Sequence, residues 1–327
     1  MARFRQLARL AMLLLFLAAS SSLAQEQASP APSSSYQPVA NWLQVPPGEP
    51  VGTIAGIDFD SKGIAYVFRR CAACGVHPKD DDPPGMVWLF DMNGGFLREW
   101  GRGSIAKEAH TVRLDRNGFI WITDTGAHQV KKFKPDGTLL MTLGKYGIPG
   151  DGPDTFNMPT DVAVAPNGDF FVSDGYGNQR VVKFNREGKF IKTWGGKGTG
   201  PGQFRLPHSI VQDSRGRLIV ADRCGLSATK CTGDRIEIFD TDGNFLDQWT
   251  QLGGVPLFIS SDDTLYVGVN GTIFITDART GKVRDVIEKT GPNHQIAVDQ
   301  VGNVYSAQLG GGLRRFTRTS SSPATLP

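Results

Sequence analysis

The segment FRLPHSIVQDSRGRLIVAD (204–222) holds two short runs of apolar residues, separated by the turn sequence Ser-Arg-Gly. Alternation of apolar and polar residues within each run is typical of half-buried strands, and a glycine between two such runs indicates a hairpin. The segment is therefore predicted to form a β-hairpin. Its first strand opens with His208, at the point where the chain would enter a core, and the role of this histidine has to be explained.

The same hairpin recurs along the chain. One version is found in HTVRLDRNGFIWITD (110–124), TDVAVAPNGDFFVSD (160–174), HSIVQDSRGRLIVAD (208–222) and HQIAVDQVGNVYSAQ (294–308). A second hairpin, with a Phe, a turn glycine and then Trp or Leu, is found in FDMNGGFLREW (90–100), FKPDGTLLMTL (133–143), FNREGKFIKTW (184–194) and FDTDGNFLDQW (239–249). Two hairpins give four strands in about 50 residues, which is the unit of a β-propeller blade.

The repeats predict an all-β fold, a six-bladed β-propeller. Its first strands start near Ala55, His110, Thr160, His208, Val255 and His294. The last unit contains only three strands before the chain ends. The segment VANWLQV (39–45) carries a Trp, as the fourth strands of other units do, and is predicted to supply the missing strand and close the ring. An open solenoid of the same units is the alternative, and this N-terminal segment favours closure.

The N-terminal residues 1–24 have the layout of a secretory signal peptide. Three arginines precede an apolar run over residues 10–19, and Ser-Leu-Ala comes before Gln25. That run is too short to span a membrane. Residues 25–37 and 319–327 are rich in Ser, Pro and Ala and are predicted to be a flexible linker and tail, which leaves 38–318 for the propeller. The protein is expected to be exported, to the periplasm or outside the cell.

The charge balance limits the partners. The formal net charge is +3, which equals the three arginines of the predicted signal peptide, so the remaining chain is balanced. A balanced chain lacks the basic surface that binds nucleic acid or an anionic membrane. We therefore expect a small-molecule or peptide ligand, no nucleic acid, no membrane, and a monomer.

Three of the five histidines occupy one register. His110, His208 and His294 open the first strands of the second, fourth and sixth units. Since first strands line the channel of a propeller, these side chains would lie roughly 120° apart around the axis at one height. A single histidine there is most often a hydrogen-bonded core residue, but three on alternate blades indicate a metal site, and zinc is the metal most often held by three histidines. His77 and His128 fall in loops and are predicted to be solvated turn residues.

The loops between second and third strands return to the face above these histidines. They carry Arg70, Tyr176 and Arg223. A phenol close to guanidinium groups could have its pKa lowered enough to act as a base. Arginines there could hold a carboxylate in a planar, two-point contact. An exposed loop tyrosine with no chemical role is the alternative for Tyr176.

The chain resembles the peptidyl-α-hydroxyglycine α-amidating lyase family from about residue 51 to residue 318. The resemblance is strongest in FNMPTDVAVAPNGDFFVSDGYGNQRVVKF (156–184), PGQFRLPHSIV (201–211) and LIVADR (218–223). It implies a six-bladed propeller of NHL repeats and cleavage of an N-acyl or peptidyl α-hydroxyglycine to an amide and glyoxylate. It also implies an axial zinc on His110, His208 and His294, with Tyr176 as the base and Arg70 and Arg223 in the active site.

The resemblance further implies a structural calcium, bound by the backbone carbonyls of Ile57 and Val112 and by an aspartate just after the third histidine. In this chain that aspartate is replaced by Gln295, so the sequence leaves calcium binding open.

The cysteines also depart from the family, whose disulfide positions hold other residues here. This chain has Cys71, Cys74, Cys224 and Cys231. In an exported protein they are expected to form two local disulfides, Cys71–Cys74 and Cys224–Cys231, in the loops that carry the two arginines. A four-cysteine zinc site is less compatible with their positions in units one and four.

Two other functions are open to a propeller with these repeats. A non-catalytic exported module could bind a peptide, a protein or a glycan, which explains the repeats but not the histidine register. A calcium lactonase of the gluconolactonase type would need carboxylates on the axis, where this chain offers histidines.

Overall fold

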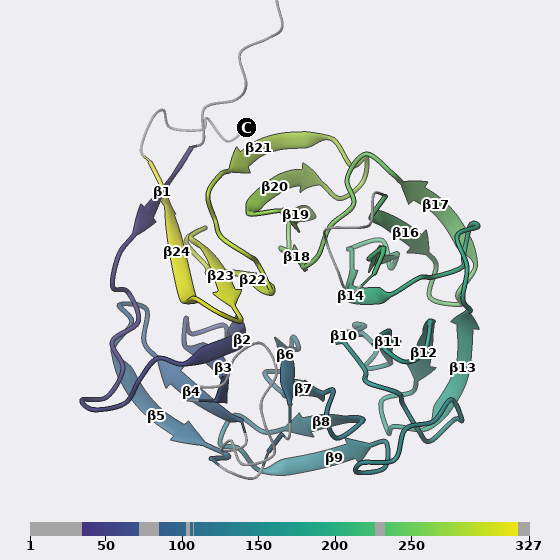
Figure 1. The fold of residues 1–327 in the computed structure, drawn as a ribbon, viewed down its shortest axis with the longest axis horizontal. Coiled ribbons are helices and arrows are strands. Elements are labelled where there is room, and N and C mark those ends of the chain that lie inside the picture. The colour runs from purple at the N-terminus through teal and green to yellow at the C-terminus, as the bar shows by residue number, and fades with distance from the viewer. Residues whose placement is uncertain (1–34, 72–84, 103–104, 107, 226–232, 320–327) are drawn as a thin grey trace, which may run out of the picture. The chain divides into compact units, whose positions relative to one another are not determined.

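The structure is a computed structural model that describes residues 35–71, 85–102, 105–106, 108–225 and 233–319. All of these residues belong to one compact unit. Within them there are 24 strands and no helix, arranged as six four-stranded antiparallel sheets around a common centre (Figure 1). The described part of the chain thus contains no helix that could cross a membrane. The predicted signal peptide lies outside the described residues.

Each sheet is one blade, and its strands are consecutive in five of the six blades. Blade 1 contains β2 (Thr53–Phe59), β3 (Ala65–Cys71), β4 (Met86–Phe90) and β5 (Phe96–Trp100); blade 2 contains β6 (Ala109–Leu114), β7 (Ile120–Asp124), β8 (Gln129–Phe133) and β9 (Leu139–Leu143); blade 3 contains β10 (Asp161–Val164), β11 (Phe170–Asp174), β12 (Arg180–Phe184) and β13 (Phe190–Gly195). Blade 4 contains β14 (Pro207–Gln212), β15 (Leu218–Asp222), β16 (Arg235–Phe239) and β17 (Phe245–Trp249); blade 5 contains β18 (Leu257–Ile259), β19 (Thr264–Val269), β20 (Thr272–Asp277) and β21 (Val283–Ile287); blade 6 contains β22 (Gln295–Val298), β23 (Val304–Gln308), β24 (Gly312–Arg318) and β1 (Tyr36–Val39).

The hairpin predicted over 204–222 is confirmed as β14 and β15. Its turn is fixed by Asp213, whose carboxylate accepts hydrogen bonds from the backbone N–H groups of Arg215 and Arg217 at 3.0 and 2.8 Å. Gly216 follows with φ +80°, a left-handed conformation that favours glycine over residues with a Cβ. The polar turn residues therefore set the register that carries the apolar residues of both strands into the core.

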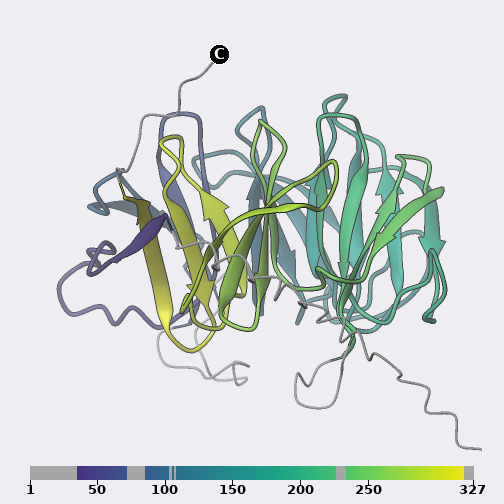
Figure 2. The same ribbon diagram turned by 90° about the horizontal axis from the view of Figure 1, so that it is seen from above.

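The first strands of the blades lie nearest the centre of the ring (Figure 1), and the strands run between two faces formed by loops (Figure 2). The apolar cores lie between neighbouring blades. Between blades 3 and 4, for example, Phe171 and Val181 pack with Phe204, Val220 and Phe239. Each blade is thus buried on both sides by its neighbours, which is why the repeats need a closed ring.

Ring closure is confirmed, but the strand that provides it differs from the prediction. The fourth strand of blade 6 is β1, Tyr36–Val39, paired with β24, and not residues 39–45. This strand includes residues 36 and 37, which precede the segment 38–318 predicted for the propeller. Trp42, the residue that suggested the later strand, instead packs against Tyr305 at a ring-centroid distance of 4.8 Å and donates to the carbonyl of Met92. It fills the junction between blades 6 and 1.

Candidate metal centre

The three histidines meet on the axis of the ring. The ligand atoms of His110, His208 and His294 all lie within 4.8 Å of one another, and the ring centroids are 4.6 to 5.9 Å apart. His110 and His208 are buried, and His294 is partly buried. The predicted convergence of alternate first strands is therefore present in the fold, and these residues are the one group of potential metal ligands among the described residues.

Neighbouring blades fix the orientation of two of the rings. The Nδ1 of His110 is 2.6 Å from the carbonyl oxygen of Thr160, and the Nδ1 of His294 is 2.6 Å from that of Ala55. Both carbonyls belong to the next blade, at the position equivalent to the histidine. A carbonyl can only accept, so each Nδ1 carries the proton and each Nε2 presents a lone pair. Second partners of this kind are typical of metal-binding histidines.

The imidazoles are held neutral. Burial lowers the pKa of His110 and His208 well below the usual value, and it lowers that of His294 to about 3. The Nε2 of His294 is buried and has no hydrogen-bond partner. A buried acceptor without a donor costs roughly 1–3 kcal/mol. The donor set thus fits a cation, because neutral imidazole nitrogens are what a metal requires.

Tyr176 reaches the same point from the loop between β11 and β12. Its hydroxyl lies 3.0 Å from the Nε2 of His110 and 2.9 Å from the Nε2 of His208. Burial raises the pKa of Tyr176 to about 12, while Arg223 and Arg70 act in the opposite direction. The arginines do lower this pKa, as the sequence predicted, but burial raises it by more, so the net shift is upward.

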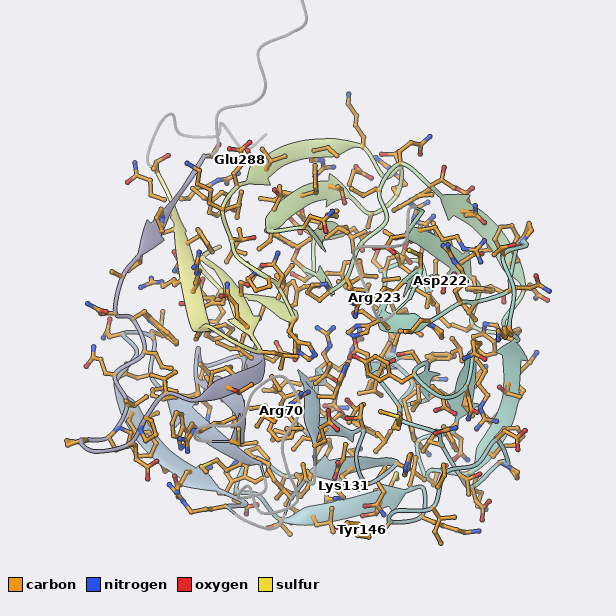
Figure 3. The ribbon with its side chains drawn as sticks, in the orientation of Figure 1. Arg70, Lys131, Tyr146, Asp222, Arg223 and Glu288 are labelled. Atoms are coloured by element: carbon orange, nitrogen blue, oxygen red, sulfur yellow. The ribbon has the colours of Figure 1, made fainter. Side chains whose placement is uncertain are left out.

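The two arginines come from opposite sides of the ring, and both lie close to its centre (Figure 3). Arg70 is buried at the end of β3, where its Nε donates to the carbonyl of Ala109 at 2.8 Å and its guanidinium lies 3.4 Å from Glu108. Arg223 follows β15 and is half-buried, with its backbone N–H bonded to the carbonyl of Leu206. Both positive charges act on the Tyr176 phenol.

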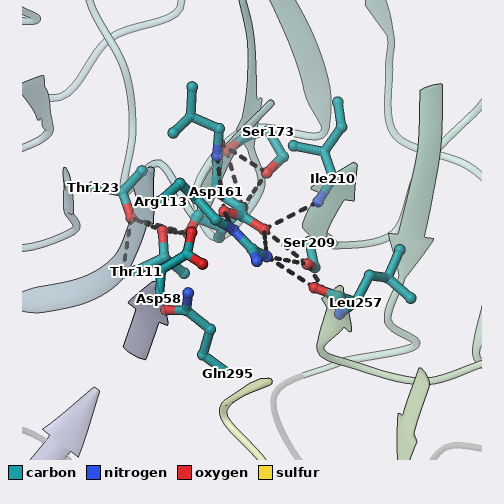
Figure 4. Close-up of polar contacts among 12 residues, drawn as sticks. Asp58, Thr111, Arg113, Thr123, Asp161, Ser173, Ser209, Ile210, Leu257 and Gln295 are labelled. Carbon is teal, nitrogen blue, oxygen red and sulfur yellow. Dashed lines mark hydrogen bonds and ion pairs between the residues drawn. The ribbon is translucent and has the colours of Figure 1, made fainter. Parts of the chain in front are cut away.

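A second polar layer lies one to three residues further along the inner strands (Figure 4). Arg113 from β6 donates to both carboxylate oxygens of Asp161 at 2.9 and 2.6 Å. It also donates to the hydroxyl of Ser209 at 3.3 Å and to the carbonyl of Leu257 at 2.9 Å. One guanidinium therefore links blades 2, 3, 4 and 5.

Gln295 links the other blades of this layer. Its side-chain Nε2 donates to the carbonyls of Ile57 and Val112 at 3.2 and 2.5 Å, and its Oε1 accepts from the N–H of Val112 at 3.1 Å. These are the two carbonyls that the family resemblance assigned to calcium. Here the amide group occupies the space in front of them, so the residues present do not fit a cation at this position.

The remaining residues singled out in the sequence are His128, His77 and the four cysteines, and some of them lie outside the described residues. His128 lies in a turn, as expected, with φ 59°, but it is partly buried and not solvated as predicted, because its Nδ1 accepts from the N–H of Met158. Neither Cys71 nor Cys224 is a free thiol. Their predicted partners Cys74 and Cys231, and His77, lie outside the described residues, so the two pairings stay predictions.

The sequence analysis missed Glu108 and the backbone acceptors. Glu108 stands two residues before His110, and that proximity to a predicted ligand is a signal that could have been used. The carbonyl groups of Ala55 and Thr160 could not be recognised from residue type, because every residue has a backbone carbonyl. Their register positions did mark them as the odd-blade equivalents of the histidines.

The chain is similar to proteins with NHL repeats and to amidating enzymes. The NHL repeat model matches residues 107–133 and 156–184. "Peptidyl-glycine alpha-amidating monooxygenase A" of Xenopus laevis is 34% identical over 298 residues, covering 78% of this chain and 30% of its own length. "Probable peptidyl-alpha-hydroxyglycine alpha-amidating lyase pgal-1" of Caenorhabditis elegans is 26% identical, covering 80% of this chain and 81% of its own length. The resemblance to the amidating lyases is confirmed.

Two further matches share the repeats or the fold with this chain but are not named as amidating enzymes. "NHL repeat-containing protein 3" of Homo sapiens is 32% identical, covering 61% of this chain and 55% of its own length. A gluconolactonase of Xanthomonas campestris has a TM-score of 0.61 at 13% identity, over 83% of this chain and 87% of its own, which shows the fold alone. The chain spans 22% to 30% of the length of the amidating monooxygenases that it matches, whereas it spans most of the nematode amidating lyase.

Proposed function

We propose that this protein is a zinc-dependent carbon–nitrogen lyase that cleaves a peptidyl or other N-acyl α-hydroxyglycine to the terminal amide and glyoxylate. Relatives named as amidating lyases support a lyase-like function. The observation that carries the finer proposal is the meeting of three neutral imidazoles with the hydroxyl of Tyr176. Export to the periplasm or the cell exterior, as a monomer, is part of the proposal.

The imidazoles of His110, His208 and His294 would hold the metal, for which zinc is the best candidate because it is commonly bound by three histidines in catalytic sites. A zinc ion there would supply positive charge that makes an adjacent substrate hydroxyl more acidic. The carbonyls of Thr160 and Ala55 keep two of the rings in the orientation that this requires.

Tyr176 would accept the proton of the substrate hydroxyl. As the C–N bond breaks, the O–H electron pair forms the carbonyl of glyoxylate, and the C–N pair passes to the amide nitrogen, which takes up a proton. A phenol with a pKa of about 12 is protonated at neutral pH even with Arg70 and Arg223 beside it, so the role of base requires further positive charge at this point.

Arg70 and Arg223 would also bind the substrate carboxylate. A guanidinium contacts a carboxylate through two parallel hydrogen bonds, which fixes both position and plane. The bond from Arg70 to the carbonyl of Ala109 ties that guanidinium to the residue before His110. The carboxylate and the hydroxyl of one small substrate would in this way be held by residues that are themselves linked.

The test is Tyr176→Phe, which keeps the ring and removes the hydroxyl. We expect the zinc content and the melting temperature to be unchanged. Glyoxylate release from an N-acyl α-hydroxyglycine at near-neutral pH should fall by roughly 100-fold or more, as for loss of a positioned base. A no-enzyme blank is the control, since these compounds can break down unaided. Full activity in the Phe variant would remove Tyr176 from the mechanism.

A non-catalytic binding propeller is the second candidate, favoured by the human relative that is named for its repeats alone. It predicts no glyoxylate release above the blank by the wild-type protein for any N-acyl α-hydroxyglycine tried. Stoichiometric zinc together with that result would mean that the histidine site serves another chemistry.

A further inference from the structure

The channel below the histidines contains an amide where the amidating-lyase resemblance places a cation. Gln295 is fully buried, and its carboxamide makes three hydrogen bonds, two to carbonyls and one from an N–H. Only one orientation of the amide satisfies all three, because the nitrogen faces acceptors and the oxygen faces a donor. The side chain thus joins its own blade 6 to blade 1 through Ile57 and to blade 2 through Val112.

The amide nitrogen lies in front of the two carbonyls that the resemblance assigns to calcium. It lies 2.5 Å from the carbonyl oxygen of Val112 and 3.2 Å from that of Ile57. Calcium binds such oxygens at about 2.3–2.6 Å and needs six to eight of them. The N–H groups of Gln295 already satisfy the lone pairs that would coordinate a cation, and the nitrogen fills the space between them.

The nearby carboxylates are also committed to other partners. Asp58 accepts from the N–H groups of Phe59 and Leu114, and Asp161 is held by Arg113. A buried divalent charge would therefore lack the anionic ligands that compensate for its desolvation.

Gly56 is matched to this amide. A Cβ added at Gly56 would lie 2.0 Å from the Oε1 of Gln295, which is far inside van der Waals contact. The Gln295 side chain of blade 6 has room because Gly56 of blade 1 has no side chain at that point. Gln295 and Gly56 therefore act as one packing unit.

We infer that Gln295 replaces a structural cation with a built-in donor group, so that the ring of this protein is stable without calcium. Its carboxamide holds the junction of blades 6, 1 and 2 through hydrogen bonds that a metal would otherwise replace. Shortening the side chain by one methylene and adding a negative charge, as in Gln295→Asp, frees the space between the two carbonyls and creates a calcium site. This inference does not rest on the proposed enzymatic activity.

The test compares wild-type protein with Gln295→Asp and Gln295→Met, all zinc-loaded in calcium-free buffer and then titrated with CaCl2 into the millimolar range. Calorimetry gives the melting temperature, and equilibrium dialysis with elemental analysis gives bound calcium. The wild type should bind none and keep its melting temperature. Both variants should melt about 5–10 °C lower without calcium, since buried hydrogen bonds are lost. Calcium should bind to the Asp variant alone, one per chain, and restore most of its melting temperature.

Three results would overturn the inference: stoichiometric calcium in the wild type, wild-type stability in Gln295→Met, or no calcium binding by folded Gln295→Asp. If the Asp variant does not fold in the presence or absence of calcium, the amide does not stand in a cation's place.

Discussion

The two polar layers of the central channel are built from the same inner strands and differ in how completely their groups are paired. In the histidine layer, the Nε2 of His294 is buried without a partner. In the layer beneath it, Arg113, Asp161 and Gln295 are all paired with neighbouring blades. His294, just before β22, and Gln295, its first residue, are thus neighbours that differ: the first has an unpaired nitrogen, and the amide of the second is hydrogen-bonded on both sides.

This difference in pairing suggests different roles for the two layers: one stabilises the fold and the other serves chemistry. A satisfied buried network holds blades together, because removing any member leaves an unpaired group in a low-dielectric interior. A buried acceptor left unpaired has a cost in the metal-free protein, and it is retained where a ligand is to be bound. The lower layer therefore positions the blades, and the upper layer is available for a metal and a substrate.

The largest effect is expected from His208→Ala, which removes one metal ligand. The wild type should contain about one zinc per chain, and the variant should lose both the zinc and the glyoxylate release. Elemental analysis of purified, folded protein measures the first quantity. Equal zinc in the two proteins would break the assignment of the upper layer as a metal site.

In the lower layer, Arg113→Met should lower the free energy of unfolding by about 3–5 kcal/mol, because the buried Asp161 carboxylate loses its partner. Denaturant unfolding measures the loss. The matched control is the double variant Arg113→Met/Asp161→Leu, which removes both charges and should recover most of it. A single variant as stable as the wild type would show that this layer does not hold the ring.

A smaller effect is expected from His294→Ala in zinc-free protein, in the pH dependence of stability. With a pKa of about 3 in the folded state, His294 stays neutral while the unfolded chain takes up a proton below about pH 6.5. The unfolded state is therefore favoured as the pH falls, and this residue alone costs about 2 kcal/mol between pH 7 and pH 5. The variant should lose stability less steeply over that interval. Parallel curves for the two proteins would contradict the burial of a neutral imidazole.

The smallest effect is expected from Arg223→Gln. Loss of this positive charge should raise KM roughly tenfold, through weaker binding of the carboxylate. It should also raise the pKa of Tyr176, since Arg223 is the largest influence that lowers it. A base must be deprotonated, so the rising limb of the kcat/KM profile should move to higher pH. A lower kcat with no change in KM or in the pH profile would argue against both roles.

The fold was largely predictable, because every blade repeats the same alternation, turn glycine and spacing. The exception was the closing strand. Tyr36–Val39 includes Pro38 and shows little alternation, and its partner β24 is some 280 residues away, so only the tertiary pairing identifies it. Trp42 gave a misleading signal, since a buried aromatic residue marks a packed position but not a strand.

The histidine site was predictable because register alone places the three rings together. The electrostatics of Tyr176 were not, because the sequence shows the arginines but not how deeply the phenol is buried. The role of Gln295 was also hidden: the sequence shows that a glutamine replaces an aspartate, but not that its amide reaches two carbonyls on other blades. Long-range contacts of single side chains cannot be inferred from local patterns.

Closure of the ring by β1 and β24 has a consequence for biosynthesis. Five blades consist of contiguous segments, but blade 6 needs both β1 and β24, the first and the last of the described strands. During translation, β1 has no partner until residues up to Arg318 have been added. His294, which lies on this blade, is also the last of the three imidazoles to be made. The nascent chain thus completes the set of three histidines only after the first five blades have been made, when the ring itself can close.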